Sequence, residues 1–113
     1  MELSLNRTDA ATIVSISGDI DAKSAPDIQS QVLPVVSADL PLVLDMSQVD
    51  YMSSAGLRML LSIYRQSAAT KARLVISGLS PELTDVMSAT GFLEQFSLSD
   101  TVQSALESLG GEH

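Results

Sequence analysis

Two segments near the N-terminus show the side-chain patterns that are typical of strands. Residues 2–6 alternate polar and apolar side chains, and residues 12–17 are rich in β-branched residues with partial alternation. A period of two indicates a strand with one buried face. The polar residues between the two segments predict a tight turn. We therefore expect an antiparallel hairpin at this end of the chain.

Three later segments predict further strands. Residues 42–44 and 74–76 are continuous apolar runs without alternation, as in strands that are buried on both faces of a parallel sheet. A weaker strand is expected at 96–98. The strands therefore form two groups, an N-terminal hairpin and a buried parallel set.

Helices are predicted before, between and after these later strands. Capping residues, early prolines and acids mark the helix starts, and apolar residues recur at helical spacing behind them. The second helix covers residues from about 54 to 68, Pro34 is expected to kink or end the first, and Gly91 stops the third. The expected starts are a cap at Ser24, about residue 54, a cap at Ser80, and a cap at Ser99 or Asp100.

The order of these elements predicts an α/β fold. Strands that are separated by helices of this length imply right-handed crossovers and a mainly parallel sheet. We expect a mixed sheet of four to five strands, about four helices and an N-terminal β-hairpin. A chain of 113 residues has the size of one domain, so residues 1–113 are expected to form a single domain, with 110–113 as a frayed tail.

Composition and charge exclude several classes of function. Fourteen acids against six bases give a net charge of −8, which disfavours binding to nucleic acid or to an anionic membrane surface. No apolar stretch is long enough to span a bilayer, and no signal peptide is present, so we expect a cytoplasmic protein. Cysteine is absent and the single histidine is the last residue, which removes most catalytic and zinc-binding arrangements.

Motifs for cofactor binding are also missing. Neither of the glycine-rich nucleotide-binding loops occurs, and no serine lies in the nucleophile motif of hydrolases. The carboxylate pairs Asp19/Asp21 and Asp45/Asp50 could hold Mg²⁺ or exchange protons, but such spacing arises easily in an acidic chain. We therefore predict a protein that is not an enzyme and that has no cofactor and no metal.

The strongest positive signal is the entrance of the second helix. Ser53 and Ser54 stand where free backbone N–H groups and the helix dipole favour an anion. A serine at this place has two interpretations. It can cap the helix, which stabilises it by about 1 kcal/mol, or its hydroxyl can accept a phosphate that the same N–H groups would stabilise.

Gly56 and Arg58 follow in the first turns of this helix. Glycine there costs roughly 0.8 to 1 kcal/mol relative to alanine, so either a neighbouring strand or a partner protein approaches closely. Arg58 is either an ordinary surface arginine or part of a partner surface. Met46 and Met52 flank the preceding loop, where core filling is favoured over an interface role.

These residues together carry a resemblance to a known family. The chain resembles the STAS domain of bacterial anti-sigma factor antagonists over essentially its whole length. The supporting segments are Gly18-Asp19-Ile20-Asp21, residues 44–49 and residues 52–57. The most specific run is D-x-S-x-V-x-x-x-x-S-x-G-L, formed by Asp45, Ser47, Val49, Ser54, Gly56 and Leu57.

The resemblance implies a phosphorylation-controlled binding switch. Such an antagonist binds an anti-sigma factor that is also a serine kinase, is released on serine phosphorylation, and is reset by a PPM-type phosphatase. Ser54 matches the phosphoacceptor, and Asp21 matches an acid close to it. Ser53 and Ala55 stand where the family commonly has an aspartate and a second serine. The implied partner-binding residues are Asp21, Ser53, Ser54, Gly56 and Arg58.

Two other functions remain open at this point. The chain could be a STAS scaffold of a transporter or signalling complex that is never phosphorylated. It could also be a small-ligand or nucleotide-binding STAS domain that uses the helix start as an anion site.

Overall fold

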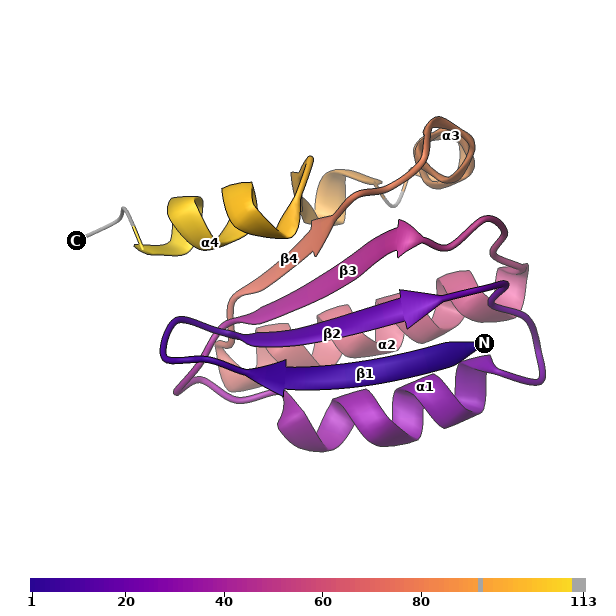
Figure 1. Cartoon of the computed structure of the whole chain (residues 1–113). Coiled ribbons are helices and arrows are strands. Elements are labelled where there is room, and N and C mark those ends of the chain that lie inside the picture. The colour runs from indigo at the N-terminus through magenta and orange to yellow at the C-terminus, as the bar shows by residue number, and fades with distance from the viewer. Residues whose placement is uncertain (92, 111–113) are drawn as a thin grey trace.

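The computed structural model describes residues 1–91 and 93–110, and it shows a five-stranded sheet with helices on both faces (Figure 1). The strands lie side by side in chain order, from β1 at one edge to β5 at the other. β1 pairs with β2 in an antiparallel manner, and the remaining pairs are parallel. The predicted α/β fold with a mixed sheet and an N-terminal hairpin is confirmed.

The predicted elements are present. Their bounds are β1 Glu2–Arg7, β2 Thr12–Ser17, α1 Ala25–Val32, a 3₁₀ turn Leu33–Val35, β3 Leu42–Gln48, α2 Ser54–Thr70, β4 Leu74–Ser77, α3 Pro81–Ala89, a 3₁₀ turn Leu93–Gln95, β5 Ser97–Ser99 and α4 Val102–Gly110. Gly110 ends α4, and residues 111–113 of the expected tail lie outside the described residues.

The larger core fills the space between the sheet and the helices α1 and α2. Val14, Leu44 and Ile76 lie side by side in register across the three central strands, and all three are fully buried. Ile28 of α1 and Leu60 of α2 pack into the same cluster. Because alternate residues of a strand point to one face, this register commits the next residue of each strand to the opposite face.

Helix α4 covers part of that opposite face. A smaller apolar cluster there joins Val43 and Val75 of the sheet to Ala105 and Leu109 of α4. Figure 1 shows α4 on the side of the sheet away from α1 and α2. The sheet is therefore buried on both faces in its centre, which explains the continuous apolar runs of β3 and β4.

Each helix starts after a strand, so the helices begin at one end of the molecule. α1 follows β2 and α2 follows β3, and both lie on the same face of the sheet (Figure 1). Their N-termini therefore meet at the carboxyl edge of the two strands. This edge is where ligands and partners of parallel sheets are usually bound.

Three details differ from the sequence-based expectations. The strand predicted at 42–44 continues to Gln48, because residues 42–48 pair with β2 on one side and in part with β4 on the other. Ser24 is the N-cap residue of α1, as predicted, but its side chain accepts no hydrogen bond from that helix. The cap of α4 is Thr101 instead of Ser99 or Asp100: its Oγ1 accepts a 3.0 Å bond from the Ser104 N–H.

The helices of the described residues are too short or too polar to cross a membrane.

The N-cap predicted at Ser80 is confirmed, since its hydroxyl accepts a 3.1 Å hydrogen bond from the Leu83 N–H. α1 ends at Val32, two residues before Pro34, as expected.

Ser77, the last residue of β4, allows a test of how the sheet is packed. Its hydroxyl is buried and has no hydrogen-bond partner in the described part of the chain. Burying an unpaired hydroxyl lowers the stability of the folded state. We expect Ser77→Ala to stabilise the protein by about 1 kcal/mol, which raises the melting temperature by about 4 °C.

Thermal unfolding followed by circular dichroism measures this effect, with Ser80→Ala as the control. That variant loses a bonded cap and should unfold at a lower temperature. A melting temperature of Ser77→Ala below that of the parent protein would mean that the Ser77 hydroxyl is satisfied in solution.

Candidate functional site

The candidate site is formed by the loops that follow β2 and β3. The Ile20 N–H donates to the Tyr51 carbonyl at 2.9 Å, and the Ser53 N–H donates to the Ile20 carbonyl at 2.8 Å. Ile20 also forms a parallel bridge with Met52. These bonds extend the pairing of the two strands into their loops. They place the loop that carries Asp21 directly beside the start of α2.

Ser53 is the cap of α2. Its backbone is extended, with φ −78° and ψ 175°, and its hydroxyl accepts a 3.4 Å hydrogen bond from the Gly56 N–H. Serine and aspartate are both favoured at this position because an oxygen of either side chain can accept from the first turn. Ser53 therefore supplies the capping oxygen without the negative charge that an aspartate would add.

Ser54 has a different environment from its neighbour. It is the first residue of α2, its side chain is exposed, and its hydroxyl has no hydrogen-bond partner among the described residues. The two interpretations of the serine pair thus fall on two residues. Ser53 is the structural cap, and Ser54 offers a free hydroxyl at the positive end of the helix dipole.

The other residues of the D-x-S motif have structural roles. Asp45 accepts from the backbone and the hydroxyl of Ser47, at 3.1 and 2.7 Å, at the end of β3. Val49 and Leu57 belong to the core, and Gly56 is buried. Among the polar side chains of this motif, only that of Ser54 has no hydrogen bond to another described residue.

Packing within the chain explains Gly56. A Cβ atom built at this position would lie 2.5 Å from Met52 Cγ and 2.8 Å from Ile20 Cγ2, well inside van der Waals contact. The close neighbour is part of the chain itself, as one of the two expected causes required, but it consists of the loops after β2 and β3 and not of a strand. Gly56 thus lets α2 begin against the loop that follows β2.

Asp21 is exposed at this loop, and its carboxylate holds the turn that leads into α1. Oδ1 accepts from the backbone N–H groups of Lys23 and Ser24, both at 3.0 Å, and from the Ser24 hydroxyl at 3.2 Å. These hydrogen bonds, chiefly those from the backbone of Ser24 and Lys23, lower the pKa of Asp21. The side chain is therefore ionised at neutral pH and adds a negative charge to the loop beside Ser54.

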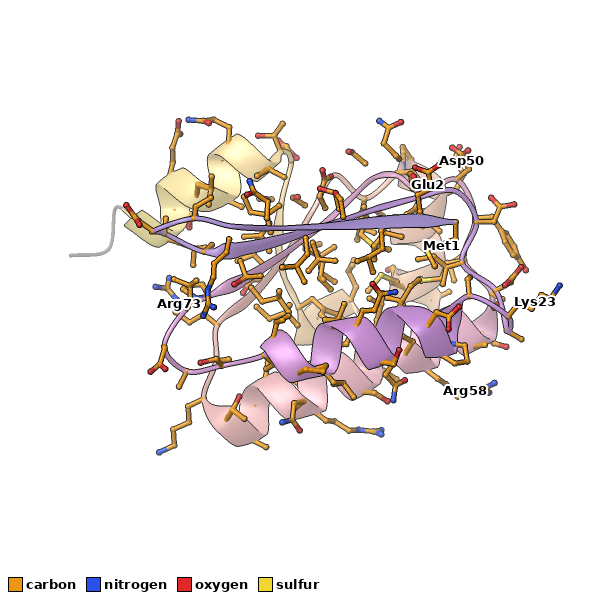
Figure 2. All side chains as sticks on the ribbon, turned by 60° about the horizontal axis from the view of Figure 1, so that its bottom comes forward. Met1, Glu2, Lys23, Asp50, Arg58 and Arg73 are labelled. Atoms are coloured by element: carbon orange, nitrogen blue, oxygen red, sulfur yellow. The ribbon has the colours of Figure 1, made fainter. Side chains whose placement is uncertain are left out.

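Arg58 is exposed one turn after Ser54 and borders a groove between α1 and α2. The groove has a volume of about 380 Å³. Figure 2 shows Arg58 and Lys23 at the end where the two helices begin, with Arg73 at the opposite end. The walls of the groove are formed by Ala22, Ala25, Pro26, Gln29, Ser30, Leu33, Ala55, Arg58, Met59 and Ser62.

This groove was not predicted from the sequence. Its walls come from two helices that are far apart in the sequence, and neither helix has a pattern that marks it as a wall. The one available signal was the small side chain in the first turn of each helix, Ala25 and Ala55. Small residues there leave space between the helices.

The flanking residues and the carboxylate pairs have simpler roles. Met46 and Met52 are buried, as the core-filling interpretation predicted, while Tyr51 is 55% exposed. Asp45 accepts from Ser15 and Ser47, so hydrogen bonds within the chain account for its position. Among the described residues no group of three potential ligands could hold a metal ion.

Comparison with known families agrees with this arrangement. The model of the STAS domain family matches residues 2–105, which is nearly the whole chain. The chain belongs to the STAS domain family. The expectation drawn from the motif residues is therefore confirmed at the level of the family.

Named members of the family resemble this STAS domain along most of its length. The anti-sigma-B factor antagonist of Bacillus subtilis is 28% identical over 98 residues, which cover 87% of this chain and 84% of that protein. An anti-sigma factor antagonist from Mycobacterium paratuberculosis has a similar structure, with a TM-score of 0.81, 29% identity, and coverage of 96% of this chain and 93% of that one.

The Bacillus protein SpoIIAA shares the fold. Its unphosphorylated form aligns with a TM-score of 0.80 and 17% identity, over 99% of both chains. Its phosphorylated form aligns with a TM-score of 0.74 and 16% identity, over 95% of this chain and 98% of that one.

Replacing Gly56 tests the contact on which the site is built. Gly56→Ala gains helix propensity of about 1 kcal/mol, but overpacking against Ile20 and Met52 costs about 1 to 3 kcal/mol. We expect a net loss of stability, measured as a lower urea midpoint with an unchanged slope. A midpoint equal to or above that of the parent would mean that the two side chains move aside freely.

The Asp21 carboxylate predicts a dependence of stability on pH. Its pKa is lowered on folding, so its contribution is complete above the ordinary value of 3.8 and is lost as pH falls through the lower folded pKa. Asp21→Asn should therefore unfold at a lower temperature than the parent at neutral pH, and the difference should shrink below 3.8. A difference that is constant across that range would contradict the assignment.

Proposed function

We propose that this STAS domain is an anti-sigma factor antagonist that binds its partner when Ser54 is unmodified and releases it when Ser54 is phosphorylated. The partner is an anti-sigma factor of the serine-kinase type, and a PPM-type phosphatase removes the phosphate. The role is one of binding and does not require catalysis by this chain. We place the protein in the cytoplasm, where such partners act.

The observation that carries this proposal is the separation of roles between two adjacent serines. Ser53 accepts the bond that caps α2, so Ser54 is not needed to hold the helix. Modification of Ser54 therefore leaves the cap and the core contacts in place. This is the property that a reversible switch requires, since the fold must survive both states.

Phosphorylation would change the charge of this surface strongly. A phosphoserine adds about −1.5 to −2 charges and three acceptor oxygens. The dipole of α2 tolerates that charge in the free protein. In a complex that fits a neutral hydroxyl, the same group brings steric crowding, loss of hydration and repulsion from ionised Asp21. Partner affinity should fall while the fold is retained.

The exposed position of Ser54 also suits the transfer itself. The Ser54 oxygen forms a bond to the γ-phosphorus of ATP as the bond from that phosphorus to the bridging oxygen breaks. ADP leaves, and the hydroxyl proton passes to a base of the kinase. The groove between α1 and α2 begins beside Ser54, at Ala55 and Arg58, and offers the partner an adjoining contact surface.

A charge-mimicking change at Ser54 tests the switch. We expect Ser54→Asp to weaken binding to the partner at least tenfold, because two or three imperfectly compensated contacts are enough to lose about 1.4 kcal/mol. Ser54→Ala should bind as the parent does. Both are measured by co-purification of the tagged protein from the cells that make it, followed by titration of the recovered partner.

Intact-mass measurement of the same material checks the modified residue, with the adjacent serine as a matched control. The parent and Ser53→Ala should carry one phosphate, and Ser54→Ala should carry none. Phosphate that persists in Ser54→Ala, or equal binding by Ser54→Asp and Ser54→Ala, would refute the assignment and favour a scaffold role.

A further inference from the structure

Helix α2 carries two arginines and no acid. Arg58 and Arg65 are both exposed, and neither side chain has a hydrogen bond or ion pair with another described residue. In a protein with a net charge of −8, a helix with unpaired positive charge is unusual. The guanidinium groups of these two arginines are therefore available to bind a negative group.

Arg58 lies close to Ser54 on the surface of α2. The two residues are four apart in one helix, so their side chains lie on the same face about one turn from each other. A helical side chain leans toward the N-terminus and covers the turn before its own Cα. The guanidinium of Arg58 is therefore within reach of a group attached to the Ser54 oxygen.

The other charges around Ser54 are mainly negative, so a phosphate there depends more on Arg58 for a positive partner. Asp21 lies in the loop beside Ser54 and Asp50 in the loop that leads into α2, and both carboxylates repel an added phosphate. Lys23 and the amino group of Met1 also lie at this end (Figure 2), and the charge of Lys23 acts on Asp21. Arg58 is the positive group that shares a helix face with Ser54.

We propose that Arg58 pairs with the phosphate on Ser54 within the same helix, through two parallel N–H to oxygen bonds. This inference rests on the proposed phosphorylation of Ser54. Arginine suits the role because its planar fork matches the oxygens of a phosphate. An acidic group that precedes its basic partner by four residues is also the favourable order in a helix.

The pairing would give phosphorylation a second effect on the partner surface. Arg58 borders the groove between α1 and α2, and in the unmodified protein its donors bond to no other described residue. Once paired with the phosphate, these donors are no longer available to an acidic group of the partner. A single modification thus adds a negative charge and removes a positive one from the same surface.

The test uses phosphoserine placed at position 54 during translation, which needs no knowledge of the kinase. The second pKa of the phosphate, near 6, is read from the phosphorus NMR shift as a function of pH. Pairing with arginine favours the dianion and lowers this pKa. We expect Arg58→Ala to raise it by about 0.5 of a pH unit and Arg58→Lys, which keeps the charge but loses the fork, by less.

Arg65→Ala is the matched control. Arg65 is exposed on the same helix but lies roughly 16 Å further along its axis than Ser54, beyond the screening length at physiological salt. The Arg65→Ala substitution should therefore leave the phosphate pKa unchanged. An unchanged pKa in Arg58→Ala, or equal shifts in both alanine variants, would overturn the pairing. A shift confined to Arg58→Ala would support it even if native Ser54 were never phosphorylated, in which case only the switch would fail.

Discussion

The close contact between the loop after β2 and the first turn of α2 is the constraint on which the site depends. Ile20 is hydrogen bonded to both Tyr51 and Ser53, and its side chain occupies the space that a Cβ at Gly56 would need. This contact fixes where α2 begins. It also brings the loop of Asp21, which follows β2, beside the start of α2, which follows β3.

That contact allows the site to be rigid and exposed at once. Gly56 and Met52 are buried beneath the helix start, whereas Ser54 stands on the outer side of the same turn. The hydroxyl is therefore presented by a part of the molecule that is tied to the core. A charge added there is expected to act on whatever binds the surface, since little of the protein's own packing involves Ser54.

Much of this could be predicted from the sequence, and the failures have physical causes. The apolar runs of β3 and β4 and the cap of α3 depend on local patterns, and they were found. The N-cap position of α1 was predicted but its hydrogen bonds were not, and the cap of α4 was misplaced, because several polar residues precede each helix and only tertiary position selects among them. Asp21 holds the turn into α1 through bonds that no local pattern indicates, and the separate roles of Ser53 and Ser54 depend on side-chain positions that the sequence does not show.

The neutral cap at Ser53 has a consequence for the proposed switch. An aspartate at that position would cap α2 equally well, but it would add a permanent negative charge beside Ser54. With serine there, Lys23 and Arg58 offset the charges of Asp21 and Asp50 before modification. Phosphate then makes this surface strongly negative. A partner that senses charge would therefore distinguish the two states more sharply than it would with an acid at position 53, because the unmodified state contributes less repulsion.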